Sequence, residues 1–401
     1  MSLTCSSIRN LLLGVVFLGA FSNVFAKAAT GEPVLVGLDA EFSLENSISA
    51  QSIETGLKVA MDEINARGGV LGVRPLQLVT KDNGSIPARG IKNIREFAAM
   101  PNLVAVFGGR FSPVLLEELP VLKETQTLLL APWSSADPIV DNGSNPNYVF
   151  RLSLRDSLAM PKMLEVAKSR GIHQVGLLLT NTGWGRSNKL QADRYALSHP
   201  DPKIVHTAWY NFKDTSLIDK YDSLVRAGSK AIILVANDDE AATLVKEVAA
   251  LPPEKRIPIL SHWGVAGGQF VKQAGSALQA VDFSVIQTFS FYGKSSPALT
   301  QFYKFAAPYG IHAPKDIGAP TGVAHAYDLM QILARAIDLA KSTDRSKVRD
   351  ALEKVKNYPG IVRNYSQPFS AERHEALTSK ELFMARFKAN GELMPVGYTK
   401  D

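Results

Sequence analysis

Short apolar runs of strand length alternate with longer stretches of helical period along most of the chain. From Ile53 to Ile64 apolar residues recur on one helical face, and Gly68 and Gly69 mark the end of that helix. This alternation is typical of a parallel sheet covered by helices, so we predict an α/β fold. The predicted strands are Val34–Leu38, Leu76–Thr80, Leu103–Phe107, Thr127–Ala131, Val175–Thr180, Ile204–Trp209, Ala231–Ala236, Ile257–Ser261 and Phe283–Thr288.

The alternation occurs twice. The turn-rich stretch Asn142–Pro146 separates a first series of strands from a second that begins near Val175. The length of 401 residues exceeds what one hydrophobic core usually supports. We therefore predict two doubly wound parallel-sheet lobes. The rest of the chain is predicted to add helices at Pro297–Ala307 and Val323–Ala340 and strands near Ser366–Phe369 and Leu382–Phe387.

The first residues have the pattern of a secretory signal peptide. Arg9 precedes the apolar stretch Leu11–Ala20, and small residues follow it, so we expect cleavage after Ala26, with Ala28 as the alternative site. The apolar stretch is shorter than the roughly 20 residues of a permanent membrane anchor. We therefore predict a cleaved signal peptide at residues 1–26 and secretion of the mature chain.

Composition and charge restrict the class of function. Charged residues make up 20% of the chain, and the net charge of +6 is not gathered into a basic run, so we do not expect nucleic acid as a partner. The one cysteine, Cys5, lies in the predicted signal peptide, and the histidines have no paired spacing typical of metal ligands. We expect no metal and no cofactor.

Catalytic motifs are missing from the sequence. It has no Gly-x-Ser-x-Gly elbow and no His-Glu-x-x-His, so we predict no catalytic residues. A secreted enzyme that uses His262 with Asp238 is the less favoured alternative.

Candidate ligand-binding residues follow the predicted strands, because ligands of open α/β sheets bind outside the carboxyl ends of the strands. Three of the four tryptophans are among them, whereas Trp209 ends a strand, a position that is ambiguous and more often belongs to the core. The candidates are Arg110, Ser112, Trp133, Ser134, Ser135, Trp184, Asn237, Asp238 and Trp263, with His325 from a later helix.

Each candidate also has a structural interpretation. The serines suit helix N-caps, and Asp238 opens an acidic first turn favoured by the helix dipole. Arg110 suits a solvated surface charge as well as a bidentate partner of a carboxylate. A histidine beside a tryptophan, as we expect for His325, is more often a packing residue than a base or a metal ligand.

Several stretches carry a resemblance to a known family. They are Ser52–Gly72, in which a helix ending in Glu63-Ile64-Asn65-Ala66 is followed by Gly68-Gly69-Val70-Leu71-Gly72, then Lys81–Asn83, Leu119–Glu124 and Ala324–Asp328. The chain resembles the periplasmic solute-binding proteins of ABC transporters, in the family that includes the leucine/isoleucine/valine-binding proteins, with the type I periplasmic-binding fold.

The resemblance implies two lobes joined by a three-strand hinge, with crossovers near Phe150–Ser153, Val285–Phe289 and Tyr365–Phe369. Lobe 1 would contain residues 31–150 and 289–365, and lobe 2 residues 151–288 and 366–398. It also implies a monomer that closes on a small-molecule ligand and then docks on a membrane permease. Since the same fold serves receptors, a membrane sensor is the alternative partner.

The resemblance further implies roles for the candidates. The loops at Gly109–Ser112 and Trp133–Ser135 would hold a ligand carboxylate, Trp184 would cover the ligand, and Asn237 and Asp238 would complete the second lobe. Amino-acid binders of the family have an acidic residue where this chain has Trp263. That acidic residue pairs with the ligand ammonium. Unless Asp238 takes its place, the ligand is expected to be an aromatic or amide-bearing carboxylate, or a quaternary amine in a tryptophan cage.

Overall fold

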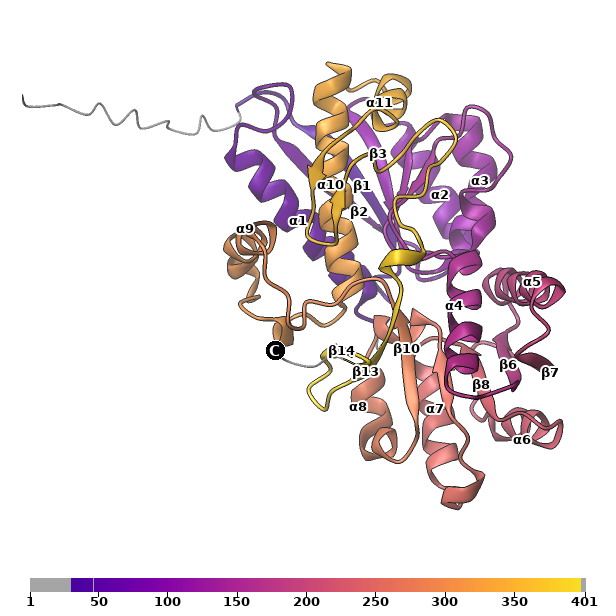
Figure 1. Cartoon of the computed structure of the whole chain (residues 1–401). Helices are drawn as coiled ribbons and strands as arrows, with labels where there is room; N and C mark the ends of the chain where they lie inside the picture. Colours follow the sequence, from indigo (N-terminus) through magenta and orange to yellow (C-terminus); the bar gives the residue numbers. More distant parts are fainter. Residues whose placement is uncertain (1–29, 46, 398–401) are drawn as a thin grey trace, which may run out of the picture.

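The computed structural model describes residues 30–45 and 47–397, and it has two lobes, each built around one β-sheet (Figure 1). The predicted signal peptide lies outside the described residues. The upper lobe of Figure 1 contains β1 to β5 and the lower lobe contains β6 to β10. An α/β fold with two parallel-sheet lobes is therefore confirmed.

The sheet of the first lobe has five parallel strands in the order β2-β1-β3-β4-β5. Helices follow the strands in alternation, as the apolar pattern predicts. The strands are β1 (Val34–Ala40), β2 (Leu76–Asp82), β3 (Leu103–Gly108), β4 (Leu129–Ala131) and β5 (Val149–Arg151), and the helices are α1 (Ser49–Ala66), α2 (Pro87–Ala98), α3 (Ser112–Thr125), α9 (Pro297–Ala306), α10 (Pro320–Ala340) and α11 (Arg345–Leu352).

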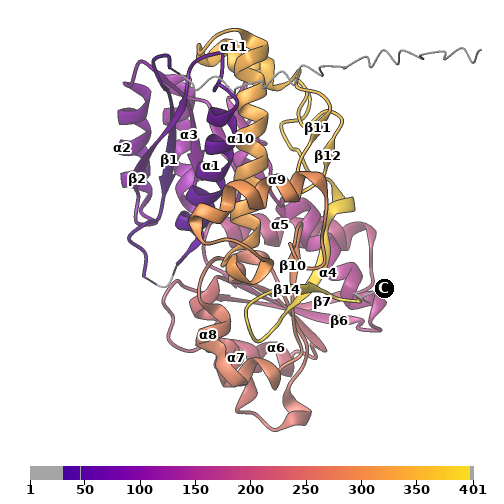
Figure 2. The same cartoon turned by 90° about the vertical axis from the view of Figure 1, so that its left-hand side faces the viewer.

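Both faces of this sheet are buried. The side chains of Val36 and Leu38 in β1 belong to the same core as α1 and α10, whereas Val106 in β3 packs with α2 and α3. Figure 2 shows α1 and α10 side by side near the middle of the first lobe, with α2 at its left-hand edge. Because successive side chains of a strand point to opposite faces, strands covered on both faces are apolar almost throughout.

Glycine ends α1 as the sequence predicts. Gly68 and Gly69 have φ angles of 105° and 76°, a region that residues with a side chain rarely adopt. A Cβ on Gly69 would also lie 2.1 Å from the carbonyl oxygen of Arg74. The chain then makes a tight turn, closed by the bridge between Val70 and Arg74, before β2 begins at Leu76.

The sheet of the second lobe has seven strands in the order β14-β13-β10-β9-β8-β6-β7. Strands β6 to β10 are parallel, and β13 and β14 add antiparallel at one edge. The elements are β6 (Gln174–Thr180), β7 (Lys203–Tyr210), β8 (Ala231–Val235), β9 (Ile259–Ser261), β10 (Phe283–Gln287), β13 (Phe383–Phe387) and β14 (Leu393–Pro395), with α4 (Asp156–Ser169), α5 (Gly183–Ser198), α6 (Ile218–Arg226), α7 (Asp238–Ala249) and α8 (Phe270–Ala274).

The hinge contains a buried ion pair. The chain leaves the first sheet after β5, where Arg151 forms a parallel bridge with Glu375. The Arg151 guanidinium donates through Nε to Glu375 Oε2 at 2.9 Å and through Nη1 to the carbonyl oxygen of Ala136 at 2.8 Å. Since both side chains are buried, this pair ties two passages of the hinge together.

The third passage between the lobes lies later in the chain than expected. Tyr365 belongs to a short hairpin of β11 (Tyr358–Pro359) and β12 (Asn364–Tyr365), whose tyrosines donate to Asp328 of α10. Phe369 packs on Phe150 at a ring distance of 5.0 Å. Residues 366–369 therefore do not form the expected strand, and they remain with the first lobe because their aromatic neighbours are there.

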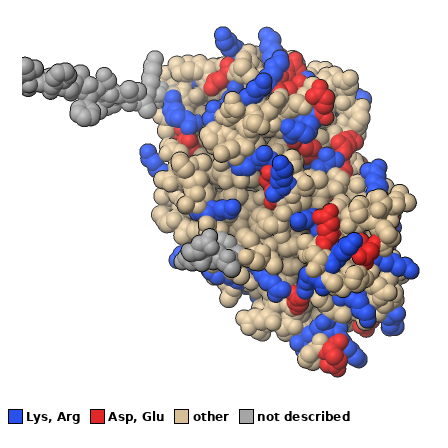
Figure 3. Space-filling model, in the orientation of Figure 1, with Lys and Arg blue, Asp and Glu red and all other residues tan. Residues whose placement is uncertain are grey.

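Within residues 30–45 and 47–397, no helix has the length and apolarity needed to span a membrane. Basic and acidic side chains are interspersed on the face shown in Figure 3.

Trp209 is 38% exposed, so its expected core position is wrong. It lies on β7, an edge strand that has a neighbouring strand on one side only.

Candidate functional site

A cavity lies between the lobes and is lined by the segments that follow strands of both sheets. The space outside the protein atoms is about 280 Å³, part of it open to solvent. The side chains of the two lobes leave free room there for about one water molecule. The lining residues are Arg110, Phe111, Ser112, Pro113, Trp133 and Ser135 of the first lobe and Trp184, Phe212, Asn237, Trp263 and Gly264 of the second.

Three tryptophans form the walls of the cavity. Trp133 of the first lobe lies 6.0 Å from Trp263 of the second, with ring planes tilted by 53°. Trp184 begins the first turn of α5 and is 6% exposed, whereas the other two rings are 1% exposed. The structure thus brings together the three tryptophans that the sequence places after strands.

A buried carboxylate fixes the second-lobe aromatics. Asp156 Oδ1 accepts hydrogen bonds from Trp184 Nε1 at 3.2 Å and from His262 Nε2 at 3.1 Å. His262 Nδ1 in turn accepts from the backbone N–H of Trp263 at 2.9 Å. His262 therefore pairs with Asp156 and not with Asp238, the partner in the enzyme alternative.

His325 lies beneath the cavity and does not line it. Its Nδ1–H donates to the carbonyl oxygen of Pro132 at 3.0 Å, and its Nε2 accepts from Thr288 Oγ1 at 2.9 Å. Complete burial lowers the pKa of His325 to about 4. The neutral ring connects the Trp133 loop to the second hinge passage, so it supports the site without facing it.

The serines serve the loops as well as the cavity. Ser134 Oγ donates to the carbonyl oxygen of Gly109 at 2.8 Å, and Ser112 Oγ accepts from the backbone N–H of Ala136 at 3.2 Å. Neither is an N-cap: α3 begins at Ser112 itself, and Phe111 holds the cap position. Ser112 and Ser135 line the cavity, whereas Ser134 holds the two loops together.

Arg110 and Asp238 pair with each other across the cleft. Arg110 Nη1 donates to Asp238 Oδ1 at 2.7 Å and to the carbonyl oxygen of Gly264 at 3.1 Å. Their side chains are only 4% and 3% exposed. The interpretation of Arg110 as a solvated charge is therefore wrong, and Asp238 opens α7 while its carboxylate faces the other lobe.

Two buried donors at the cavity have no hydrogen-bond partner. They are Arg110 Nε and Trp133 Nε1. A buried N–H without an acceptor costs free energy, and a ligand that supplies an oxygen removes that cost.

Beyond the ion pair, a wider groove of about 840 Å³ opens to solvent between Leu44, Ile86, Phe212 and Glu240.

The candidates from the sequence do not include the lining residues Phe111, Pro113, Phe212 and Gly264, nor the supporting Asp156. Phe212 contacts Phe111 of the other lobe at a ring distance of 6.1 Å, and it comes two residues after β7. The rule that selected the other candidates applies to it as well. Asp156 had no such signal, because it follows a hinge passage and not a strand of the second sheet.

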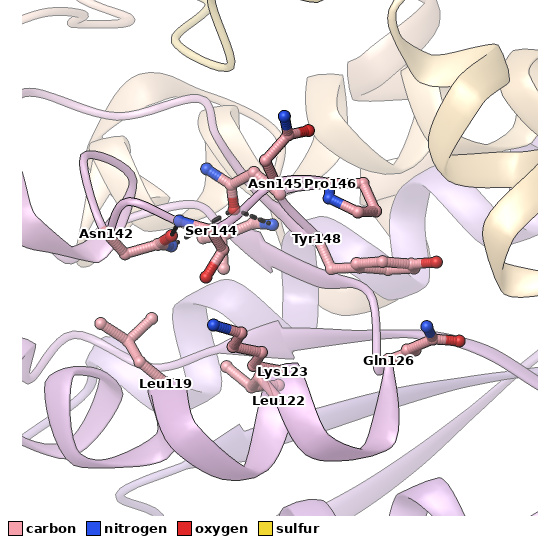
Figure 4. Close-up of a pocket in the computed structure, with 11 residues that line it drawn as sticks. Leu119, Leu122, Lys123, Gln126, Asn142, Ser144, Asn145, Pro146 and Tyr148 are labelled. Atoms are coloured by element: carbon pink, nitrogen blue, oxygen red, sulfur yellow. Dashed lines mark hydrogen bonds between the residues drawn. The ribbon is translucent and has the colours of Figure 1, made fainter.

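A second cavity lies within the first lobe, between α3 and the segment Asn142–Val149 (Figure 4). The amides of this segment bond to one another and to nearby carbonyls: Asn142 Nδ2 donates to the carbonyl oxygen of Ile139 at 3.0 Å and Asn147 Nδ2 to that of Val140 at 2.8 Å. It contains no residue of the other lobe, so it is not a site at which lobes close.

Two sheet lobes joined by a three-passage hinge, with a cavity formed by the strand ends of both, define a binding protein of the type that encloses its ligand. A family model described as periplasmic binding protein matches residues 33–392, and the chain belongs to this family. No curated protein matches the sequence.

Solved structures show the same fold. A type 1 periplasmic binding protein from Bordetella pertussis Tohama I has a TM-score of 0.81 at 21% identity, over 91% of this chain and 100% of that one. LivJ of Streptococcus pneumoniae in complex with isoleucine has 0.74 at 21%, over 90% and 98%. A solute-binding protein of R. palustris in complex with 4-hydroxybenzoate has 0.75 at 15%, over 91% and 95%.

Proposed function

We propose that this chain is the extracytoplasmic solute-binding component of an ABC importer and that it encloses a small amino-acid-like, amide or aromatic carboxylate ligand between its lobes. The observation that carries the proposal is the cavity whose lining comes from strand ends of both sheets. The free space there holds about one water molecule, so the lobes must separate to admit a ligand. A ligand that then contacts both lobes favours the closed arrangement by its differential affinity.

The cavity chemistry supports this ligand class. Trp133, Trp184 and Trp263 supply flat apolar walls, while Ser112 and Ser135 supply hydroxyls. Similar proteins bind isoleucine and 4-hydroxybenzoate, and one is named a fatty acid transporter component. All three ligand types have a carboxylate next to an apolar body.

The same proposal includes the partners. The signal peptide at residues 1–26 directs the chain to the periplasm, where the closed monomer docks on a membrane permease.

No catalytic step is assigned to the cavity. His262 is buried and its two ring nitrogens are both hydrogen-bonded within the protein, to Asp156 and to the backbone of Trp263.

A ligand screen with matched tryptophan variants tests the proposal. Amino acids, aromatic acids and amides are screened for a rise in the midpoint of thermal unfolding. A ligand at 100 times its Kd stabilises the protein by about 2.7 kcal/mol. We expect the ligand-induced rise in the unfolding midpoint to disappear in Trp184→Ala. It should only shrink in the milder Trp184→Phe, because both variants remove part of the cavity wall.

Trp209→Ala is the control, since Trp209 is a partly exposed tryptophan on β7 and does not line the cavity. It should keep the full ligand effect. If Trp184→Ala binds the ligand as tightly as the unaltered protein does, the ligand does not occupy this cavity and the proposal is wrong.

A further inference from the structure

The charge of the inner cavity has one sign. Of the described residues that line it, Arg110 is the charged one, and neither aspartate nor glutamate is among them. The Arg110 guanidinium also lies 4.7 Å from the centre of the Phe111 ring, which occupies that aromatic face with a cation. Among these lining residues, a ligand ammonium would find no carboxylate to pair with.

The nearest carboxylate is withdrawn from the cavity by its partner. Asp238 accepts from Arg110 at 2.7 Å and borders the outer groove. Glycines close over the ion pair: a Cβ on Gly268 would lie 1.8 Å from Asp238 Oδ2, and one on Gly267 would lie 2.2 Å from Arg110 Nη1. Backbone therefore packs against one side of the pair, and the Asp238 carboxylate is held by Arg110, while the pair also borders the outer groove.

Two other acids near the site do not line the cavity. Asp156 Oδ1 accepts from Trp184 and His262, and its buried Oδ2 has no hydrogen-bond partner. Glu41 is buried, and its oxygens accept from Ser49 Oγ and from the backbone N–H of Arg110. Two lining residues, by contrast, have buried donors without an acceptor, Arg110 Nε and Trp133 Nε1.

We propose that the Arg110–Asp238 pair determines the ligand class: the cavity takes ligands that combine an apolar or aromatic body with a carboxylate or carbonyl oxygen, and it rejects ligands that carry an ammonium. The inference rests on the proposed function and narrows it. The ligand oxygen satisfies Arg110 Nε and Trp133 Nε1, and an ammonium finds no carboxylate in the same space.

Two matched series of probes separate the charges. The first is 3-phenylpropanoate, phenylalanine and 2-phenylethylamine, and the second is 4-methylpentanoate, leucine and 3-methylbutylamine. Each series keeps one side chain while it adds the ammonium and then removes the carboxylate. Titration calorimetry on the full chain at neutral pH should give at least tenfold tighter binding of the acid than of the amino acid in the series that fits the cavity, and no binding of the amine.

Variants assign the preference to the ion pair. Arg110→Gln removes the cation and frees Asp238, so acid affinity should fall at least tenfold while the amine gains relative to the acid. Asp238→Asn keeps the cation, so the preference for the acid over the matched amine should remain although the loss of the pair changes both affinities. Asp219→Asn removes an exposed carboxylate of α6 and should change nothing.

The outcomes distinguish the two levels of the proposal. Amino acids that bind as tightly as their matched acids overturn this inference and leave the proposed function standing. An acid preference that survives unchanged in Arg110→Gln also overturns it. If no compound in either series or in the wider screen binds, the proposed function is contradicted, and the inference falls with it.

Discussion

At the scale of single residues, His325 shows how burial fixes a protonation state. In the unfolded chain a histidine binds its proton near pH 6.5, but burial lowers the pKa of His325 to about 4. Between these pH values the unfolded state holds more protons than the folded state. The free energy of unfolding therefore rises with pH across this window and is lost on acidification.

The prediction is that His325→Gln removes part of this pH dependence. The shift corresponds to about 3 kcal/mol between roughly pH 7 and pH 4, at about 1.4 kcal/mol per pH unit. Urea unfolding of both proteins across this range measures the difference, in which the titration of all other groups cancels. Equal pH slopes for the two proteins would mean that His325 does not titrate in this way.

Candidate site residues were predictable where one local rule applies. Trp133, Trp184 and Trp263 follow strands, and the carboxyl ends of parallel strands meet at one edge of a sheet. The pairing of Arg110 with Asp238 was not predictable, because it joins residues 128 positions apart on different lobes. Local pattern contains no information on which charge of one lobe faces which charge of the other.

At the scale of elements, the close packing of α1 on α10 depends on a glycine. A Cβ on Gly56 would lie 2.3 Å from the carbonyl oxygen of Val323 and 3.1 Å from the Cβ of Ala326. Backbone cannot yield as the end of a flexible side chain does. The two helices therefore approach at Gly56 as closely as a residue without a side chain allows.

Gly56→Ala should destabilise the protein by about 1–3 kcal/mol, because the added methyl forces the helices apart. Helix propensity alone predicts the opposite, a gain of roughly 1 kcal/mol. Gln51→Ala, at an exposed position of α1, is the control and should stay within about 0.5 kcal/mol of the unaltered protein. Denaturant unfolding decides between the two signs, and a more stable Gly56→Ala would contradict the packing argument.

Element positions followed from the apolar pattern with different success along the chain. Strands such as β3 and β6 are long, apolar and buried on both faces, so their predicted ranges match closely. The short strands β5, β11, β12 and β14 were not predicted as strands, because two or three residues are too few to show a period. The position expected for the third hinge passage came from the family resemblance and not from an apolar period.

At the scale of the whole molecule, the Arg110–Asp238 pair acts between the lobes. Both side chains are buried at the lobe interface, where their interaction is screened little by solvent. Removal of one partner from a buried ion pair costs about 3–5 kcal/mol, since the other charge is left without compensation. Solvation of that charge requires the cleft to open.

We therefore expect Asp238→Asn and Arg110→Gln to open the ligand-free protein. Small-angle X-ray scattering should show a larger radius of gyration for both variants than for the unaltered chain and for Asp219→Asn. The exchanged pair, Arg110→Asp with Asp238→Arg, should recover part of the compact form. An unchanged radius of gyration in both single variants would show that the pair does not hold the lobes together.

The sequence by itself determined the class of fold and the type of site. Strand and helix periods are local, and so is the placement of tryptophan and serine after strands, which made an aromatic cavity at the sheet edges predictable. Tertiary structure alone decided how the charges are used. Arg110 and Asp238 come from different lobes, and only the closed arrangement removes both from water and makes each the other's partner.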